Sequence, residues 1–317
     1  MRGFLVVILG SLCLATQNVL VRVIFSESTI LGQFTWGGLI APSPANSLLI
    51  LQMRSLLILP VMALLSYRLY PATGQILKAL VQPQMRTVRW LALISSVFLF
   101  IALTLLFIAL ASIPAGVATV LFFIHPVITG LLSWWVFGHR PSLLRVGVTA
   151  GVLVGSVLVV PSFAGLGNSQ MGLGVGAALG ASVAYSIQGI LAQICFRQID
   201  PVPFTLINFG VIVLLSSLGL LLVQIDVSAD QWPSLWLISL FTAGLTLLGQ
   251  LLYNIGIHLV RAASMAIVAV SNPVFTAAIA WLVLQESLQG RQFVGMVLVV
   301  VSIIALGQEQ TRTAPSS

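Results

Sequence analysis

Residues 109–148 decide the fold of this 317-residue chain: ALASIPAGVATVLFFIHPVITGLLSWWVFGHRPSLLRVGV, centred on His125-Pro126. A similar stretch returns at residues 256–295, GIHLVRAASMAIVAVSNPVFTAAIAWLVLQESLQGRQFVG, centred on Asn272-Pro273. When the two prolines are superposed, identical residues coincide: Ala115 with Ala262, Thr129 with Thr276, and Trp134 with Trp281. This pattern indicates one unit that is written twice.

Composition sets the class of protein. The chain is 59% hydrophobic and only 6% charged, whereas about a quarter of the residues in soluble domains are charged. Its apolar runs are about 20 residues long and lack strand-like alternation, so we expect an all-α integral membrane protein and no β-barrel. The net charge of +7 does not predict nucleic-acid binding, because Lys78 is the only lysine and the arginines are dispersed.

Hydropathy and punctuation predict ten transmembrane helices, at residues 4–25, 47–66, 90–110, 114–137, 142–160, 172–195, 204–224, 235–257, 262–284 and 292–307. A Gly/Ser/Asn-rich loop at 161–170 separates the two halves. We therefore expect a first repeat at 1–161, a second repeat at 170–308 and a short cytoplasmic tail at 309–317. The linker at 26–46 has no counterpart in the second half, and the sequence assigns it no role.

Each half contains an odd number of helices, so the second half should enter the bilayer from the opposite side as an inverted repeat. The charges agree. One side holds Arg2, Arg68, Lys78, Arg86, Arg89, Arg140, Arg145, Arg197, Arg261 and Arg312. The other side holds Arg22 and Arg291 together with Glu27, Asp226, Asp230 and Glu286. By the positive-inside rule, both termini are cytoplasmic and the chain is a multi-pass protein of the cytoplasmic membrane.

These features resemble the drug/metabolite transporter superfamily, in its EamA-type branch. The resemblance rests on the small-residue entries, the mid-helix prolines and the short turns that follow, and it covers nearly the whole chain. The family's turn commonly reads Gly-Glu; here Gln285-Glu286 keeps the acid, and Gly138-His139 keeps the glycine. The resemblance implies a permease with a central cavity that works by alternating access and exports a small molecule.

Pro126 and Pro273 also predict a site on physical grounds. A proline inside a spanning helix removes one backbone donor, and the carbonyl that it frees must find a partner or face water. Each expected kink places a polar side chain, His125 or Asn272, near the bilayer midplane, where inverted-repeat transporters bind substrate. The alternative is that these are packing kinks whose polar side chains bond to an adjacent helix.

Further polar residues in the spans are candidates for substrate contact. Amides facing lipid are costly, so we expect these groups to point inward: Asn18, Gln188, Gln250 and Asn254, with the nearby Tyr185 and Tyr253. Interhelical hydrogen bonding is the alternative use of such residues. Arg54 either grips a substrate carboxylate or snorkels to the interface, since it lies only about 10 Å along its helix at 1.5 Å per residue; we favour snorkelling.

The substrate expected from these residues is a small neutral or zwitterionic metabolite, such as an amino acid or an amphipathic compound. No acid falls inside a span, so facilitated diffusion, exchange and proton antiport through His125 all stay open. No catalytic motif, metal site or cofactor is expected, because the two cysteines are isolated and the three histidines lie far apart. The rival interpretation is a non-transporting accessory or sensory membrane protein. The pattern neither requires nor excludes a homodimer.

Overall fold

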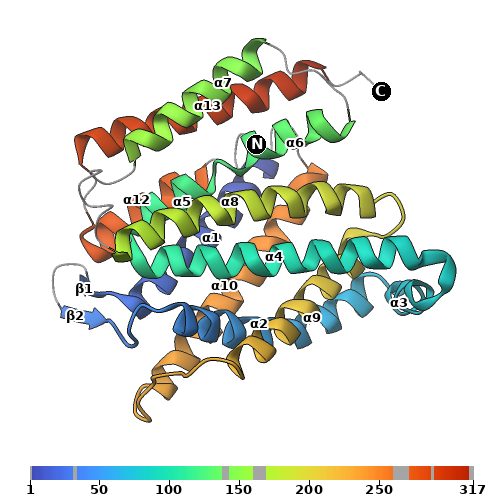
Figure 1. The fold of residues 1–317 in the computed structure, drawn as a ribbon, viewed down its shortest axis with the longest axis horizontal. Coiled ribbons are helices and arrows are strands. Elements are labelled where there is room, and N and C mark those ends of the chain that lie inside the picture. The colour runs from blue at the N-terminus through green and yellow to red at the C-terminus, as the bar shows by residue number, and fades with distance from the viewer. Residues whose placement is uncertain are drawn as a thin grey trace.

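The computed structural model describes residues 2–30, 34–137, 143–159, 169–259, 271–286 and 289–313. These residues form long helices and one small hairpin (Figure 1). In chain order the elements are α1 (Arg2–Phe25), β1 (Glu27–Ile30), β2 (Phe34–Gly37), α2 (Pro44–Leu69), α3 (Thr73–Val81), η1 (Pro83–Met85), α4 (Arg86–Ser112), α5 (Ala115–Phe122), α6 (His125–Phe137), α7 (Leu143–Val159), α8 (Ser169–Cys195), α9 (Pro201–Leu220), α10 (Trp232–Leu259), α12 (Ser271–Leu284) and α13 (Gly290–Thr313).

Seven stretches of helix in the described ranges are long and apolar enough to cross a membrane, and one of them joins α5 to α6. Three further apolar helices are shorter, at Ala150–Val159, Asn272–Leu284 and Gly290–Ser302. The chain is therefore an all-α, multi-pass membrane protein. The count of ten spanning helices and the inverted repeat stay predictions.

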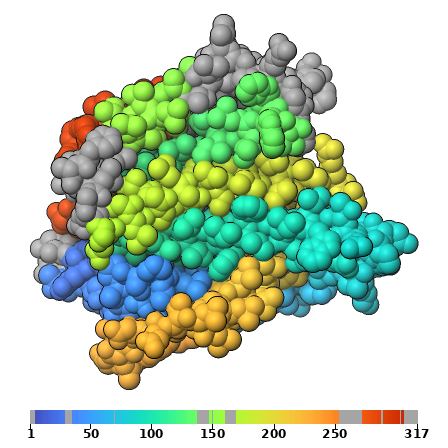
Figure 2. All heavy atoms as spheres, in the orientation of Figure 1, coloured from blue at the N-terminus to red at the C-terminus, as the bar shows by residue number. Residues whose placement is uncertain are grey.

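The helices pack in pairs that bring distant parts of the chain together. α4 lies along α8, α1 along α10, α2 along α9, and α7 along α13. In the space-filling view, α4 and α8 run as adjacent bands across the visible face (Figure 2). Polar bonds also join helices: Ser96 Oγ on α4 donates to Asn208 Oδ1 on α9 at 2.7 Å, and Gln52 Nε2 on α2 donates to Ser217 Oγ on α9 at 2.7 Å. The central packing is apolar, with Phe107, Leu110 and Leu121 almost fully buried.

The linker at 26–46 contains the antiparallel hairpin of β1 and β2, with Glu27 opposite Gly37. The hairpin returns the chain onto the end of α1, where the Gly38 amide donates to the Val23 carbonyl at 3.0 Å. Gly37 has φ +107°, and a Cβ there would lie 2.5 Å from the Ser26 carbonyl oxygen, so only glycine fits. Figure 1 shows the hairpin at one end of the bundle and α3 at the opposite end.

The predicted helix at 114–137 is interrupted. α5 ends at Phe122 and α6 begins at His125, so Pro126 lies in the first turn of a new helix and does not bend a continuous one. Pro273 lies in the first described turn of α12, and residues 260–270 before it lie outside the described residues. At the C-terminal end, α13 continues to Thr313, so the described part of the predicted tail at 309–317 is helical.

The basic loop between the second and third predicted helices also contains structure, namely α3 and η1. Just before α3, the Tyr70 hydroxyl donates a hydrogen bond to the carboxylate of Asp200, which precedes α9. This bond to the carboxylate raises the pKa of Tyr70, because the bond holds the phenol proton in place. It links the end of α2 to the start of α9.

Close packing of α7 on α13 gives a test of this arrangement. A Cβ at Gly155 would lie 2.7 Å from Val299 Cγ2 and 2.8 Å from the Gly295 carbonyl oxygen. We expect Gly155→Ala to lower the free energy of unfolding by about 1–3 kcal/mol through overpacking, measured as the apparent Tm in detergent at one scan rate. Gly147→Ala is the control on the same helix, since no atom lies within 4 Å of its added Cβ. Equal losses in both variants would contradict the packing.

Candidate functional site

His125 begins α6 at the helix break and lies in a cluster of aromatic rings. Its ring centroid is 4.7 Å from that of Tyr185 on α8, and 5.1 and 5.4 Å from those of Phe122 and Phe123. His125, Tyr185 and Phe123 are only partly buried, so part of this cluster stays accessible. The structure thus brings together two of the predicted site residues, His125 and Tyr185.

The His125 carbonyl, at the break, accepts two hydrogen bonds. One comes from Thr129 Oγ1 at 2.7 Å within α6, and the other from Ser186 Oγ at 2.9 Å on α8. At the start of a helix the amides lack intrahelical partners and the carbonyls do not, so these hydroxyl bonds are additional, and the bond from Ser186 ties α6 to α8.

Asn272 shows a parallel arrangement at the start of α12. Its carbonyl accepts from Thr276 Oγ1 at 2.9 Å, and its Nδ2 donates to the Ser11 carbonyl of α1 at 3.3 Å. A contact to an adjacent helix is thus present at both proline motifs. At Asn272 the side chain makes it, as in the packing alternative, whereas at His125 it runs through the backbone carbonyl.

Two buried side-chain atoms, one on α12 and one on α1, have no hydrogen-bond partner among the described residues. Asn272 is 4% exposed, and its Oδ1 is buried with no hydrogen-bond partner among the described residues. Gln17 Nε2 on α1 is in the same condition. Asn18 and Gln188 are 8% and 9% exposed, which agrees with the expectation that both point inward. Unsatisfied buried polar groups are uncommon in proteins and are the kind of group that a ligand can complete.

Gln250 and its neighbours on α10 differ from the expectation. Gln250 is exposed, while Thr246, four residues earlier on the same face, is buried. The face of α10 that is covered at Thr246 is therefore uncovered at Gln250, toward the helix end that the charge pattern assigns to the cytoplasm. The side chains of Tyr253 and Asn254 lie outside the described residues, although their backbone belongs to α10.

Arg54 does not snorkel, so the favoured expectation for this residue is wrong. It is 3% exposed, and its guanidinium carbon lies 4.6 Å from the centroid of the Phe107 ring on α4. Its Nε is buried with no acceptor among the residues that the structure describes. The side chain points into the bundle because its helix packs between α4, α9 and α10, which leaves its stem no direct route to the interface.

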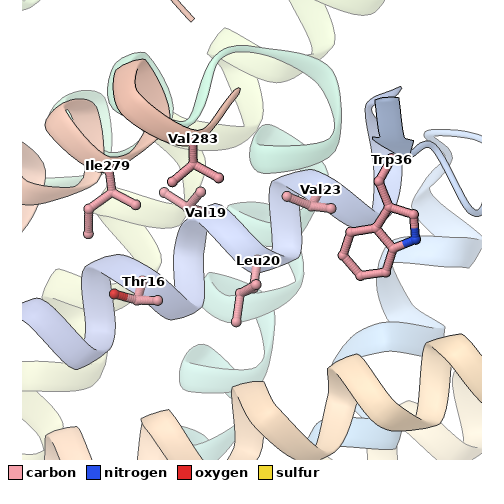
Figure 3. Close-up of a pocket in the computed structure, with 7 residues that line it drawn as sticks. All are labelled: Thr16, Val19, Leu20, Val23, Trp36, Ile279 and Val283. Atoms are coloured by element: carbon pink, nitrogen blue, oxygen red, sulfur yellow. The ribbon is translucent and has the colours of Figure 1, made fainter. Parts of the chain in front are cut away.

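A cavity of about 500 Å³ lies between α1 and α12, and the hairpin residue Trp36 is at one end (Figure 3). Its lining is Thr16, Val19, Leu20, Val23, Trp36, Ile279 and Val283. Sequence reasoning missed these residues, because apolar positions spaced along a helix do not show whether they face lipid or a cavity. A second, wholly apolar hollow of about 620 Å³ lies between α12 and α13. Within the described ranges, no three His, Cys, Asp or Glu side chains form a group that could hold a metal ion.

The buried charge of Arg54 gives a stability test. Removing an uncompensated buried charge in favour of an apolar side chain of similar volume is often stabilising, by about 1–4 kcal/mol. We therefore expect Arg54→Met to keep or raise the apparent Tm in detergent. Arg68→Met, at the exposed end of α2, is the matched control and should change it little. A large drop in Tm for Arg54→Met alone would show that the guanidinium has a stabilising partner.

Comparison with known proteins places this geometry in a family. A profile of the EamA-like transporter family matches residues 172–308. Over 315 residues the chain is 38% identical to a protein of Synechocystis sp. named as an uncharacterized transporter, covering 99% of this chain and 95% of that protein. A crystal structure with 16% sequence identity aligns with 97% of this chain and 99% of its own, with a TM-score of 0.53, which shows a shared fold. The chain belongs to the EamA-like transporter family of membrane proteins.

Proposed function

We propose that this protein is a secondary transporter that moves a small neutral or zwitterionic metabolite across the cytoplasmic membrane by alternating access around a midplane cavity. The observation that carries the proposal is the helix break at His125-Pro126, together with the matching Asn272-Pro273 in the first described turn of α12. Each motif sets a polar side chain beside a proline within a bundle helix, and polar groups at such positions bind substrate in inverted-repeat transporters. The direction that we propose is export, as the family resemblance implies.

The contacts of the helices support a 5+5 inverted repeat, with the halves at 1–161 and 170–308 and both termini in the cytoplasm. Exchanging the two predicted halves maps the pair α4 and α8 onto the pair α10 and α1, and both pairs are in contact. The two proline-containing helices obey the same exchange. α6 contacts α8, the first helix of the second half, and α12 contacts α1, the first helix of the first half. The back-bonds of Thr129 and Thr276 repeat the similarity at the level of single atoms.

The substrate class follows from the charges in the bundle. Arg54 is a buried cation, and no Asp or Glu falls inside a predicted span, so an organic polyphosphate lacks the several cations that would hold it. A zwitterion needs one cation for its carboxylate, and a guanidinium suits that role. In this proposal His125, Asn272, Asn18, Gln188, Gln250, Asn254, Tyr253, Tyr185 and Arg54 contact the substrate. Exchange, facilitated diffusion and His125-dependent antiport are the coupling modes to be separated.

The non-transporting alternative requires a sealed interior in which the polar side chains bond only one another. No hydrogen bond joins Asn18 to Gln188 within the described chain, Gln250 is exposed, and Asn272 Oδ1 lacks a partner there. These observations favour transport.

Counterflow in proteoliposomes tests the transport proposal. Vesicles loaded with unlabelled amino acids or amphipathic metabolites are given labelled tracer outside, at two pH values. We expect exchange by the parent protein, reduced at least about tenfold by Asn272→Ala and by His125→Ala, because a lost hydrogen bond to substrate is worth about one factor of ten. Ser156→Ala, which removes a buried hydroxyl bonded within α7, is the control.

The outcomes of counterflow separate the alternatives. Loss of pH dependence only in His125→Ala indicates proton coupling through that residue. No exchange of any compound, with folded protein in the vesicles, argues for the accessory or sensory role. An equal loss in the Ser156→Ala control would show that the effect is not specific to the breaks.

The role of Arg54 is tested with paired substrates. For a compound that exchanges, its rate is compared with that of its methyl ester, which lacks the negative charge. We expect Arg54→Met to reduce the preference for the free carboxylate at least about tenfold, because charge-assisted hydrogen bonds are worth about 1.5–3 kcal/mol. An unchanged preference, with exchange intact, would remove Arg54 from the site.

A further inference from the structure

A partly buried ion pair joins the predicted halves at the hairpin end of the bundle. Arg22, in the last turn of α1, donates from Nε to Oε1 of Glu286, just beyond α12, at 2.9 Å. The two side chains are 14% and 16% exposed, so water screens the pair less than it screens a surface pair. The bond spans 264 positions of the chain.

Both members of this pair also bond to helix ends. Arg22 Nη1 donates to the carbonyls of Leu110 and Ala111, at 3.2 and 2.9 Å, in the last turn of α4. Glu286 Oε2 accepts from the amide of Ala115, the first residue of α5, at 3.0 Å. The cation thus meets carbonyls without intrahelical partners, and the anion meets an amide without one, in the orientation that the helix dipoles favour.

The backbone at Gln285 directs Glu286 toward this position. Gln285 has φ +56° and is the one non-glycine residue with positive φ among those that the structure describes. A left-handed residue after a helix turns the chain back over the helix end, and the Glu286 amide donates to the Ala280 carbonyl at 3.3 Å. A side chain in this unfavourable conformation is retained where the surrounding contacts determine it.

Two of the helices that the ion pair links, α5 and α12, are also packed closely against each other. A Cβ at Gly116 on α5 would lie 2.9 Å from Ala277 Cβ on α12. The apolar cavity of Figure 3 also lies between α1 and α12, with Ile279 and Val283 along its wall. Separating α12 from the corner between α4 and α5 would therefore uncover residues of α12 that are now buried, such as Ala277 and Ala280.

We propose that Arg22 and Glu286 form a latch that holds the bundle closed at its hairpin end, and that this latch opens during each transport cycle. The proposal rests on the alternating access proposed above. While the latch is closed, α12 is tied through Glu286 to α1 and α5, and through Arg22 to α4. Moving α12 away requires both charge-assisted bonds of Glu286 to break, so the latch adds a barrier to opening that water or substrate must offset.

Accessibility of a reporter cysteine tests the latch without a substrate. The natural thiols are removed by Cys13→Ser and Cys195→Ser, and Ala280→Cys places one thiol on α12 at a position that is 1% exposed. A membrane-impermeant maleimide is added outside intact cells, and the labelling rate is measured. We expect Glu286→Gln and Arg22→Gln each to raise the rate at least about tenfold, since the closed state loses its pair.

The matched control is Glu27→Gln, which removes an acid at the same end of the bundle from an exposed position in β1. It should leave the labelling rate unchanged. The double variant of Arg22 and Glu286 should raise the labelling rate by less than the product of the two single effects, because the two side chains share one bond. Glu286→Asp, which keeps the charge on a shorter stem, should fall between parent and Glu286→Gln, and it serves if the neutral variants do not fold by size-exclusion chromatography.

Unchanged labelling in folded Glu286→Gln and Arg22→Gln would overturn the latch, and so would an equal rise in Glu27→Gln. Faster labelling without exchange of any compound in counterflow would support the latch and count against the transport proposal. Exchange that is intact alongside unchanged labelling would overturn the latch alone.

Discussion

The structure depends on one constraint: in a bilayer, a backbone amide or carbonyl must find its partner within the protein. A continuous helix meets this condition by itself, and an interrupted one does not. At the break before His125 the backbone keeps its bonding, because the Ile124 carbonyl accepts from the amides of Val127 and Ile128. Ser186 of α8 bonds to the His125 carbonyl, and Asn272 Nδ2 bonds to the Ser11 carbonyl of α1. Each proline motif is therefore joined to a neighbouring helix by a polar bond.

The two ends of the bundle differ in how they are held. At the hairpin end, Arg22 and Glu286 satisfy the ends of α4 and α5 while they bond to each other. Toward the other end, the face of α10 becomes exposed at Gln250. The hairpin end is thus held by polar bonds among α1, α4, α5 and the end of α12, whereas α10 exposes the amide of Gln250 near its other end.

Arg54 illustrates how stability and function can oppose each other at one residue. A guanidinium held over Phe107, without an acid in the described surroundings, costs free energy of burial that packing alone does not recover. In the function proposed above, the carboxylate of the substrate supplies the missing partner. The polar residues between helices have the opposite character. Asn208 and Gln52 form hydrogen bonds with serines across the helix interface, and these bonds stabilise the bundle.

The sequence by itself determined the membrane class, the approximate helix positions, the paired prolines and the family, because these depend on local hydropathy and on residues close together in the chain. Only the tertiary structure decided which side chains face inward. In a membrane protein, the side of a helix that faces lipid and the side that faces the bundle are both apolar. Hydropathy therefore does not distinguish the faces of α1, α2 or α10. Helix packing therefore decides three features: the burial of Arg54, the exposure of Gln250 and the bond from Arg22 to Glu286. The spacing of residues along the sequence does not predict that packing.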